Sequence, residues 1–515
     1  MTTFDRFRLE SAPLTIAYWI VTTCHAVAFS IPKLPPLVDY PQHLAIGAIL
    51  RRLADPASPE RALYEVNLFT YNGAFQFLVA ALAFVVRPEV AGKIVLAGMV
   101  FLFAFAVLQV LRVTGRPRHY AFALLPLSCG YVVAFGFINF FIGAAIALLI
   151  FARWWSWRET GDQRGAIVVT IAALFATWAH LLSPVSAGVC ALVVVLARFD
   201  RDAPKLVQFK RAAVALAPFV PAALLAIATV GYNARSPHAN WEHRVWNGAD
   251  YPLWMKLWQA PEFVTHDFLD GSDRWLLLPI AASLLFAWWR RGAKQTSRDL
   301  RWLALAWVLL YLVTPRVLLA TWAMFERHAV FAAVFLVAAT PRVEGTRAPR
   351  IVAWVLAASA ALGALNVVVK LATIPDDDDA SAIIDDVPSG RKLMVLDFEP
   401  EVPPLLAMPV RAHLGAFLQV RRPAEIAETF LTIESMPVHY RPARKPPLVE
   451  SGFEFTPQRW DPRSPVGKLF DLVLVISTPD PRVAMFGDDG ARVTILARRG
   501  RYWLIDTAFI AQLPP

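Results

Sequence analysis

The chain has 515 residues, of which 57% are hydrophobic and 17% are charged, and its formal net charge is +10. Soluble globular proteins usually contain about 45–50% apolar and about 25% charged residues, so this composition excludes an ordinary soluble enzyme. The apolar excess lies in long runs between Pro13 and Leu371. Several of them approach the length of about 20 residues that crosses a hydrocarbon core of about 30 Å. We therefore predict a mostly α-helical, polytopic transmembrane bundle over residues 1–372.

The positive charge is explained by membrane topology. Lys and Arg collect in the cytoplasmic loops of membrane proteins, so the excess does not indicate a nucleic acid partner. Arg6 and Arg8 precede the first apolar run, Pro13–Ile31. We interpret this run as an uncleaved anchor with a cytoplasmic N-terminus, and a cleaved signal peptide is the alternative. All three cysteines lie within apolar runs, so we expect no disulfide framework.

Assigning the basic loops to the cytoplasm predicts about eleven membrane spans. Gly73–Val86 is short for a membrane span. If it crossed the membrane, the arginine-rich loops that follow it would lie outside the cell. We therefore expect a re-entrant or surface helix. Two long outer loops result, residues 32–72 and 231–274. The predicted spans are Pro13–Ile31, Val90–Leu111, Tyr120–Phe137, Ile138–Ala152, Ala166–His180, Ser183–Ala197, Ala212–Val230, Trp275–Trp289, Trp302–Thr314, His328–Thr340 and Ile351–Leu371.

A second region begins near Thr373, where the composition becomes that of a soluble protein. The run Asp376–Asp379 predicts a solvated linker, and calcium binding is the alternative, although the run lacks the Gly and Glu of an EF-hand loop. Residues 373–515 predict a small soluble α/β domain on the outer face. Its expected strands are Lys392–Phe398, Asp471–Ser477 and a hairpin of Val493–Leu496 and Tyr502–Asp506. Its expected helices are Arg411–Val420 and one that begins at Pro481. Ala427–Ile433 is expected to form either a strand or a helix.

No catalytic grouping is visible in this second region. Asp397, Glu399 and Glu401 alternate after a predicted strand, and His413 and His439 stand alone. Nucleophilic catalysis would need a base beside a Ser or Cys nucleophile. We therefore expect structural roles for these residues.

The first outer loop carries the best candidate for chemistry. Pro41 suits the first turn of a helix, where its missing N–H costs nothing, and Asp39 and His43 lie one turn apart there. Asp39 could act as a general base on an acceptor hydroxyl, and His43 could bind phosphate or orient the carboxylate. The alternative is a capping acid with a surface histidine. An apolar stripe follows and suits a helix lying on a membrane surface: Ile46, Ile49, Leu50 and Leu53.

Three further polar residues lie at the predicted outer ends of spans, on the same side as Asp39: Asn139, His180 and Arg327. Placing a charged group within a bilayer costs about 2.5–3.5 kcal/mol even on lenient scales, so such residues are functional candidates. Arg327 with His180 could hold a lipid-linked phosphate. The alternative is that Arg327 reaches a phospholipid headgroup.

The second outer loop is rich in tryptophan. Trp241 and His243 could contribute to a sugar-binding wall, because pyranose faces stack on aromatic rings. Trp254 and Trp258 describe an interfacial amphipathic helix, and a membrane-surface belt is the alternative for the whole loop. The histidines here lack the His-x-x-x-His spacing of a helical zinc site.

Two short motifs resemble those of the GT-C superfamily of integral membrane glycosyltransferases. Asp39-Tyr40-Pro41-Gln42-His43-Leu44 is similar to the Asp-x-Pro-x-His-Leu form of the first outer loop in many bacterial members. Gly136-Phe137-Ile138-Asn139-Phe140 is similar to the matching later turn. The resemblance covers the membrane region, in which these proteins share a cytoplasmic N-terminus, short surface helices and many spans.

This resemblance implies transfer of a sugar from a polyprenyl-phosphate donor to an envelope glycan, lipid or protein acceptor, at the outer face of the bacterial inner membrane. Asp39 matches the catalytic acid position, and Tyr40 and His43 lie in the loop motif as substrate-binding candidates. Many members have two adjacent acidic residues here, whereas Asp39 is followed by Tyr40. That difference argues against a metal-dependent mechanism. The sequence indicates no cofactor, and a divalent metal is an unsupported option.

Two other functions stay open at this point. A transporter or flippase of a lipid-linked or anionic substrate would place ionisable residues at mid-membrane and show paired halves with broken helices. Here the polar residues lie at the outer ends of spans, and no two halves match. A non-catalytic envelope assembly protein is the other alternative, and the missing second acid is the argument for it.

Overall fold

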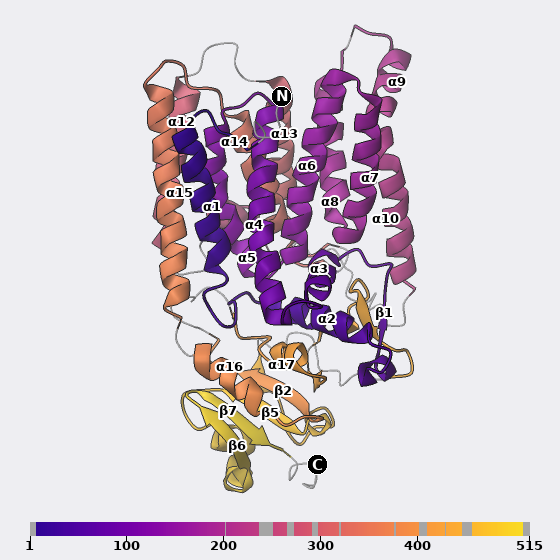
Figure 1. Cartoon of the computed structure of the whole chain (residues 1–515), viewed down its shortest axis with the longest axis vertical. Helices are drawn as coiled ribbons and strands as arrows, with labels where there is room; N and C mark the ends of the chain where they lie inside the picture. Colours follow the sequence, from indigo (N-terminus) through magenta and orange to yellow (C-terminus); the bar gives the residue numbers. More distant parts are fainter. Residues whose placement is uncertain are drawn as a thin grey trace.

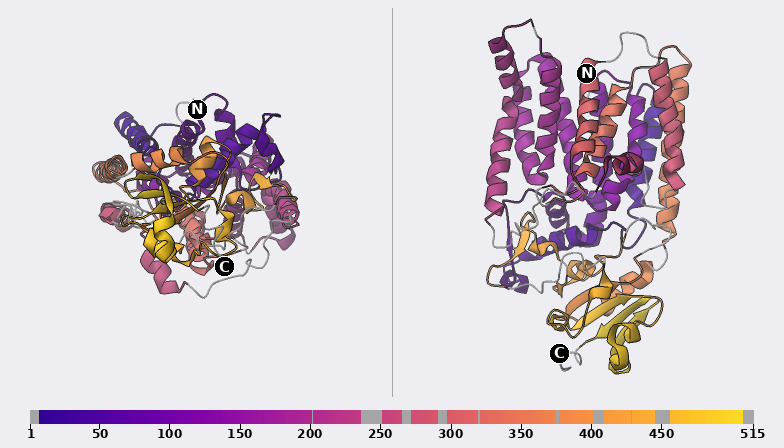
Figure 2. Two further views of the ribbon diagram at one scale, coloured as in Figure 1. Left: turned by 90° about the horizontal axis from the view of Figure 1, so that it is seen from below. Right: turned by 180° about the vertical axis from the view of Figure 1, so that it is seen from behind.

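The computed structural model describes residues 7–200, 202–235, 251–264, 272–290, 297–318, 321–374, 377–400, 409–427, 429–444 and 456–507. Within them the chain is mostly helical, as predicted, and long helices run side by side (Figure 1). The N-terminus lies at one end of this bundle, and the C-terminal sheet lies beyond the other end (Figures 1 and 2). We call the end nearest the sheet the base of the bundle.

Among the described residues, four helical segments are long and apolar enough to cross a membrane: Pro88–Val113 (α4), Ile138–Thr160 (α6), Lys205–Asn233 and Ala348–Ala372 (α15). Lys205–Asn233 consists of α9 (Lys205–Leu216) and α10 (Val220–Asn233), which meet at prolines that interrupt the backbone hydrogen bonds. Shorter apolar helices complete the bundle: α1 (Ala12–Ala28), α7 (Gln163–Ala179), α8 (Leu182–Ala197), α12 (Leu277–Trp289), α13 (Arg298–Val313) and α14 (Met324–Ala339).

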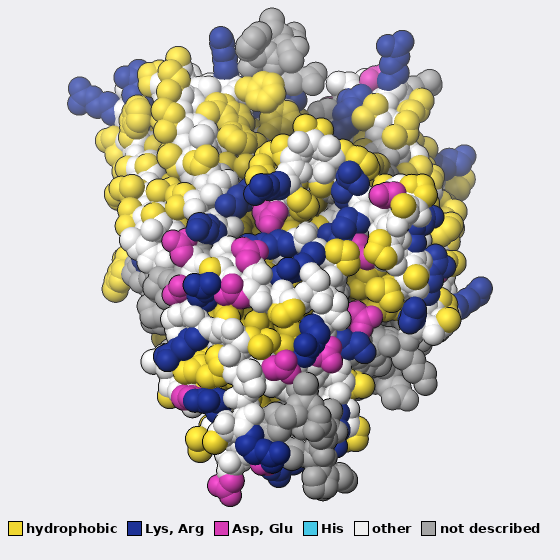
Figure 3. Space-filling view, turned by 60° about the horizontal axis from the view of Figure 1, so that its bottom comes forward, with side chains coloured by type: hydrophobic (Ala, Val, Ile, Leu, Met, Phe, Trp, Pro, Cys, Tyr) yellow, Lys and Arg dark blue, Asp and Glu magenta, His cyan; other side chains and the backbone are white. Residues whose placement is uncertain are grey.

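The surface chemistry follows this layout. Hydrophobic side chains cover the flank of the bundle in Figure 3, whereas Lys, Arg, Asp and Glu gather around its base. At the opposite end, Arg198 pairs with Glu159 (3.0 Å) and Asp299 (2.8 Å), which joins the ends of α6, α8 and α13. An apolar belt between two charged rims is the surface that a bilayer-spanning bundle requires.

The predicted span Tyr120–Phe137 is not a regular α-helix. The chain forms a 3₁₀ helix over Arg118–Cys129 and then the short α5 (Tyr131–Ala134). Pro126 lies inside this stretch and removes a backbone donor, while the segment packs against α1, α4, α14 and α15. A 3₁₀ helix rises about 2.0 Å per residue against about 1.5 Å for an α-helix, so fewer residues cover the same depth.

The first outer loop folds across the base of the bundle. It contains α2 (Tyr40–Leu53) and a strand, β1 (Tyr64–Val66). The short helix α3 (Ala74–Leu82), which the sequence predicted not to span the membrane, follows directly after the loop (Figure 1). The apolar stripe of α2 was expected to lie on the membrane surface, and that expectation is wrong. The stripe is buried against α3 and the C-terminal region, in one cluster with Tyr64, Ala80, Leu431, Met436, Val438 and Tyr440.

The C-terminal region contains a five-stranded sheet in the order β3-β2-β5-β7-β6. The predicted strands are present as β2 (Lys392–Asp397), β5 (Leu472–Ile476) and the hairpin of β6 (Thr494–Arg499) and β7 (Tyr502–Asp506); β3 is Glu425–Ile426. β2 runs parallel to β3 and β5, and β7 runs antiparallel to β5 and β6. The expected helix from Pro481 is α18 (Arg482–Phe486). The expected helix at Arg411 begins later, as α17 (Ala416–Arg421), and Phe430–Thr432 forms a 3₁₀ turn.

The predicted acidic linker is instead the start of a helix. α16 (Asp377–Asp386) packs its buried Ile383 and Ile384 against the sheet, while Asp376 lies outside the described residues. Asp378 pairs with Lys33 (2.6 Å) and Asp386 pairs with Arg499 (2.9 Å). The run therefore enters a helix at Asp377, and the Asp378 side chain is exposed to solvent beside Lys33.

Residues 409–440 join the C-terminal region to the base of the bundle. Strand β4 (Val438–Tyr440) pairs antiparallel with β1, with Tyr64 opposite Tyr440. Asn67 donates from Nδ2 to Asn233 Oδ1 (3.0 Å) at the end of α10, and also to the Met436 carbonyl (3.3 Å). α17 packs directly on α2 (Figure 1). The two predicted regions therefore share an interface built on α2.

Replacing Arg52 by Met should loosen this interface. Arg52 on α2 binds both carboxylate oxygens of Glu60 (2.5 and 2.9 Å) and donates to the carbonyls of Gln419 (2.7 Å) and Val420 (3.2 Å). Hydrogen bonds to charged groups contribute about 1.5–3 kcal/mol each, and the buried Glu60 would lose its partner. We expect trypsin to release the C-terminal region at least about tenfold faster. A loss of about 1.4 kcal/mol of interface stability raises the population of the undocked state by that factor.

Arg51→Met is the matched control for this measurement. Arg51 is the adjacent residue, and its guanidinium lies over the ring of Phe84 (4.2 Å). The control should keep the cleavage rate of the unmodified chain. Equal rates for both variants would contradict the role assigned to Arg52.

Candidate functional site

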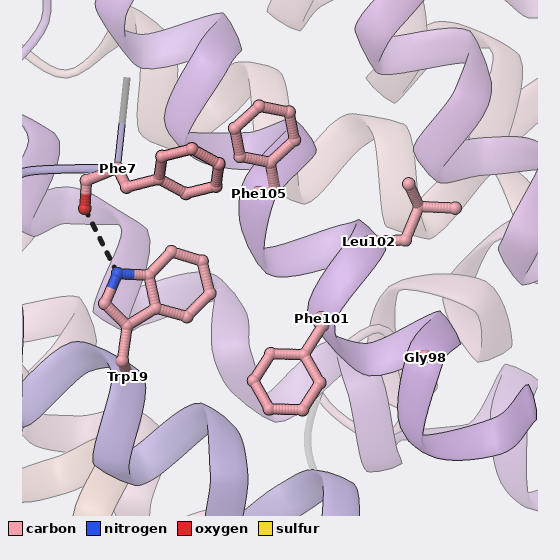
Figure 4. Close-up of a pocket in the computed structure, with 6 residues that line it drawn as sticks. All are labelled: Phe7, Trp19, Gly98, Phe101, Leu102 and Phe105. Atoms are coloured by element: carbon pink, nitrogen blue, oxygen red, sulfur yellow. Dashed lines mark hydrogen bonds between the residues drawn. The ribbon is translucent and has the colours of Figure 1, made fainter. Parts of the chain in front are cut away.

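An apolar hollow at the flank of the bundle carries no acid–base chemistry. It has a volume of about 470 Å³ and lies between the start of the chain, α1 and α4 (Figure 4). The Trp19 indole donates to the Phe7 carbonyl (3.1 Å) at its edge. Its lining contains no ionisable side chain and suits an acyl chain: Phe7, Trp19, Gly98, Phe101, Leu102 and Phe105.

A polar cluster lies at the base of the bundle, where α2 meets the C-terminal region. His413 Nε2 lies 3.5 Å from Asp39 Oδ1, and Arg327 Nη1 lies 3.4 Å from His180 Nε2. His43 is within electrostatic reach of Asp39, Arg327 and His413. The structure thus gathers four of the residues singled out from the sequence and adds His413 to them.

Asp39 is held by the turn that forms the second sequence motif. The N–H groups of Val38 and Asp39 donate to the carbonyls of Ala134 and Phe135, both at 3.1 Å. Gly136 follows with φ +89°, and a Cβ there would lie 2.8 Å from the Cβ of Asp39. Only glycine combines this backbone conformation with so close an approach. The two motifs are therefore one structural unit around Asp39.

The Asp39 carboxylate is available for chemistry. Asp39 occupies the N-cap position of α2, yet its side chain makes no capping hydrogen bond. Its side chain is 15% exposed. The alternative of a simple capping acid is therefore wrong, because the carboxylate points to the polar cluster and not to the helix N–H groups.

His43 is oriented by a chain of amides. The side chain of Asn139 accepts from the Phe75 N–H (2.7 Å) and donates to Gln76 Oε1 (2.9 Å). The Gln76 amide nitrogen then faces His43 Nδ1 (2.8 Å) as the donor, so the ring proton of neutral His43 lies on Nε2. Asn139 was predicted to bind substrate, but its amide is used inside the protein, also donating to the Asn72 carbonyl (3.0 Å).

Burial keeps His43 uncharged. Only 4% of the residue is exposed. Burial lowers the pKa of His43 to about 4, and the nearby His413 and Arg327 add to this effect, while Asp39 opposes it. At neutral pH, His43 is therefore a neutral hydrogen-bonding group and not a cation beside Asp39.

Arg327 and His180 present two donors to the same space. The Leu182 N–H donates to His180 Nδ1 (3.2 Å), so Nε2 carries the ring proton and faces Arg327 Nη1 as a second donor. The guanidinium lies over the ring of Phe137 (4.3 Å), and among the described residues its Nε has no hydrogen-bond partner. Two facing donors and an unsatisfied third require an acceptor, and an anionic oxygen meets that requirement.

A second arginine, Arg316, lies beside the start of α14. Glu326 is buried and pairs with Arg316 (3.1 Å), whose guanidinium lies over the rings of Tyr251 (5.0 Å) and Trp322 (4.6 Å). Ala323, with the left-handed φ of 56°, turns the chain into α14 just before these residues. In the first turn of α14, Glu326 therefore contacts Arg316, whereas Arg327 contacts His180.

The second outer loop is partly described. α11 (Leu253–Gln259) forms where an interfacial helix was predicted, and Trp254 and Trp258 are exposed on it. Lys256 on the same helix donates to the carbonyls of Leu312 (2.9 Å) and Thr314 (2.5 Å) at the end of α13. Trp241 and His243, predicted to bind sugar, lie outside the described residues.

Tyr40, a predicted substrate-binding residue, is buried between α2 and its neighbours. It is the first residue of α2, fully buried, with its ring against Phe75 (5.8 Å) and Phe417 (6.3 Å). Its hydroxyl lies beside Gly92 on α4, where any side chain would collide with it. Tyr40 therefore packs α2 onto the bundle.

Sequence reasoning missed His413, Gln76, Gln42 and Phe430. His413 was assigned a structural role because it stands alone in the sequence, and 371 residues separate it from its partner Gln42. No local pattern could have signalled that contact. Within the described part of the chain, no three His, Cys, Asp or Glu side chains form a metal-binding group.

Comparison with solved structures shows that the chain has the same overall fold as two known structures, and the chain is a multi-pass membrane protein. The structures are those of ArnT from Cupriavidus metallidurans. With undecaprenyl phosphate bound, it aligns at TM-score 0.52 and 12% identity over 98% of this chain and 100% of ArnT. The apo structure aligns at TM-score 0.54 and 11% identity over 98% of both chains. No protein-family model and no curated sequence matches the chain.

Gly136→Ala should displace Asp39 while leaving the fold intact. The new methyl group would collide with Asp39, and a left-handed non-glycine residue costs about 1–3 kcal/mol. If Asp39 is catalytic, we expect sugar incorporation to fall at least about tenfold, since about 1.4 kcal/mol of misplacement suffices. Mass spectrometry of envelope glycans measures the incorporation.

Gly115→Ala controls for backbone strain alone. Gly115 has φ +69°, and nothing lies within 4 Å of its virtual Cβ. This variant should bear a similar strain with unchanged incorporation. A loss of the same size in both variants would show that the contact with Asp39 is irrelevant.

Proposed function

We propose that this protein is a glycosyltransferase that moves a sugar from a polyprenyl-phosphate donor to a hydroxyl of an envelope glycan, lipid or protein. The observation that carries the proposal is the uncapped Asp39 carboxylate beside the paired donors of Arg327 and His180. In this arrangement a general base, Asp39, lies close to an anion-binding site formed by Arg327 and His180. The fold shared with ArnT, which was solved with undecaprenyl phosphate, supports a polyprenyl-phosphate lipid as the carrier.

The reaction is a single displacement at the anomeric carbon. Asp39 accepts the proton of the acceptor hydroxyl, whose oxygen forms the new bond to the anomeric carbon. The bond from that carbon to the phosphate oxygen breaks, and its electron pair leaves with the lipid phosphate. Arg327 and His180 stabilise the negative charge that develops there. Because the displacement occurs once, the anomeric configuration inverts.

The neutral state of His43 matters to this mechanism. A cationic imidazole beside Asp39 would favour the ionised carboxylate and weaken it as a base. Burial keeps His43 neutral, so the fixed positive charge of the cluster is concentrated at Arg327, beside the departing phosphate. The acid–base and anion-binding functions are therefore separated within one small site.

The proposed topology places this site outside the cytoplasm of a bacterial cell. With the N-terminus cytoplasmic, about eleven crossings of the inner membrane bring the base of the bundle to the outer face. Residues 373–515 then lie in the periplasm or outside the cell. The support is that α1 leads from the N-terminal end to the base, where Asp39, His180 and the C-terminal region all lie (Figure 1).

Asp39→Asn should abolish transfer and leave membrane insertion intact. The amide has nearly the shape of the carboxylate but cannot accept the proton, and general-base catalysis contributes about 10²–10⁴-fold. A deletion strain expressing the variant should lack the sugar seen with the unmodified chain, by mass spectrometry of its envelope glycans. Wild-type glycans in the variant would remove the central claim, and an accumulated lipid-linked intermediate at the inner face would indicate a transporter.

Arg327→Lys should weaken donor binding more than it affects folding. Lysine keeps the positive charge but loses the planar set of donors that pairs with phosphate oxygens. We expect the affinity for undecaprenyl phosphate, measured by thermal shift of the detergent-solubilised protein, to fall about tenfold or more. Arg153→Lys, at the opposite end of the bundle in an exposed pair with Asp162 (3.2 Å), should bind normally. Equal affinity in both variants would contradict the role of Arg327 in binding the lipid phosphate.

A further inference from the structure

His413 links the C-terminal region to the proposed catalytic residue. It lies in the buried segment that leads into α17, which rests on α2 (Figure 1). Its Nε2 lies 3.5 Å from Asp39 Oδ1, and its side chain is 6% exposed. It comes from the C-terminal region, whereas His43, His180 and Arg327 come from the membrane region.

The orientation of His413 is set by Gln42. The Gln42 Oε1 accepts from the Phe430 N–H (3.2 Å), so the amide nitrogen of Gln42 faces His413 Nδ1 (3.4 Å). Nδ1 is thus the acceptor, and in the neutral ring the proton lies on Nε2, toward Asp39. Hydrogen bonds therefore run from the Phe430 backbone through Gln42 to His413, and the Nε2 proton of the neutral ring faces the carboxylate 3.5 Å away.

Packing holds the ring in place. The Phe430 ring makes edge contacts with both imidazoles, at 5.6 Å from His413 and 5.5 Å from His43. Each histidine also has a glutamine amide at Nδ1, Gln42 for His413 and Gln76 for His43. The two rings are therefore oriented in the same way, and the His413 ring lies 3.5 Å from the Asp39 carboxylate.

We propose that His413 is a positioning residue that orients the Asp39 carboxylate through Oδ1 and leaves Oδ2 to accept the proton of the acceptor hydroxyl. This inference rests on the proposed function for its catalytic consequence, but the contact itself does not. During the reaction the proton moves from the acceptor to Asp39, and His413 keeps its own proton. The site is complete only when the C-terminal region is seated on α2.

Two substitutions of His413 in the full chain test this role. Gln places an amide N–H near the position of Nε2, whereas Phe keeps the ring and its contact with Phe430 but has no donor. We expect His413→Phe to lower the initial rate of sugar incorporation by about tenfold or more, because the carboxylate would lose the polar group that faces Oδ1. His413→Gln should restore most of that rate.

Infrared spectroscopy of the purified protein provides a readout that is independent of activity. The carboxylate band of Asp39 is identified by its absence in Asp39→Asn. We expect this band to shift in His413→Phe and to return in His413→Gln. His439→Phe is the matched control, because His439 is also buried in the C-terminal region but lies on β4 opposite Glu65. It should leave the band unchanged.

The outcomes separate this inference from the proposed function. An unshifted Asp39 band in His413→Phe overturns it, and so does a full rate in that variant when Asp39→Asn is inactive. A reduced rate in His413→Gln equal to that in His413→Phe also overturns it, because a donor at Nε2 would then be irrelevant. If Asp39→Asn itself retains transfer, the proposed function fails, while the band still decides whether His413 orients Asp39.

Discussion

The burial of α2 between the bundle and the C-terminal region is the constraint on which the rest of the structure depends. One side of the helix is held by the turn before α6, which accepts the N–H groups of Val38 and Asp39. The other side packs its apolar stripe against residues of the C-terminal region. Because both sides are covered, the polar start of α2 can meet groups from α7, α14 and the segment before α17 in one small space.

The electrostatic design of the site follows from that burial. Charged groups are costly away from water unless they are paired, and burial keeps His43 neutral. Amide side chains satisfy Nδ1 of both His43 and His413, and Asn139 anchors one of these amides to the backbone of α3. The Asp39 carboxylate at the start of α2 and the Arg327 guanidinium on α14 face the same space. Base and anion site are thereby separate but adjacent.

Local sequence patterns predicted much of this architecture. Long apolar runs located the long helices, and short apolar runs located β2, β5 and the β6–β7 hairpin, because the residues of such a run are neighbours in the sequence. The same reasoning failed where the partner was distant. The stripe on α2 showed that one face is buried but not by what. The run Asp376–Asp379 was predicted to be a linker because the sheet against which α16 packs lies further along the chain.

For the candidate site, the sequence by itself determined that Asp39, His180 and Arg327 lie at the same end of the bundle, since charge alternation orients every helix. It also determined the Asp39 and Gly136 motifs. Only the tertiary structure decided that these motifs touch, that Tyr40 and Asn139 are used internally, and that His413 stands beside Asp39. The physical reason is that helix period and charge are local properties, whereas a contact across 371 residues depends on how complete surfaces pack.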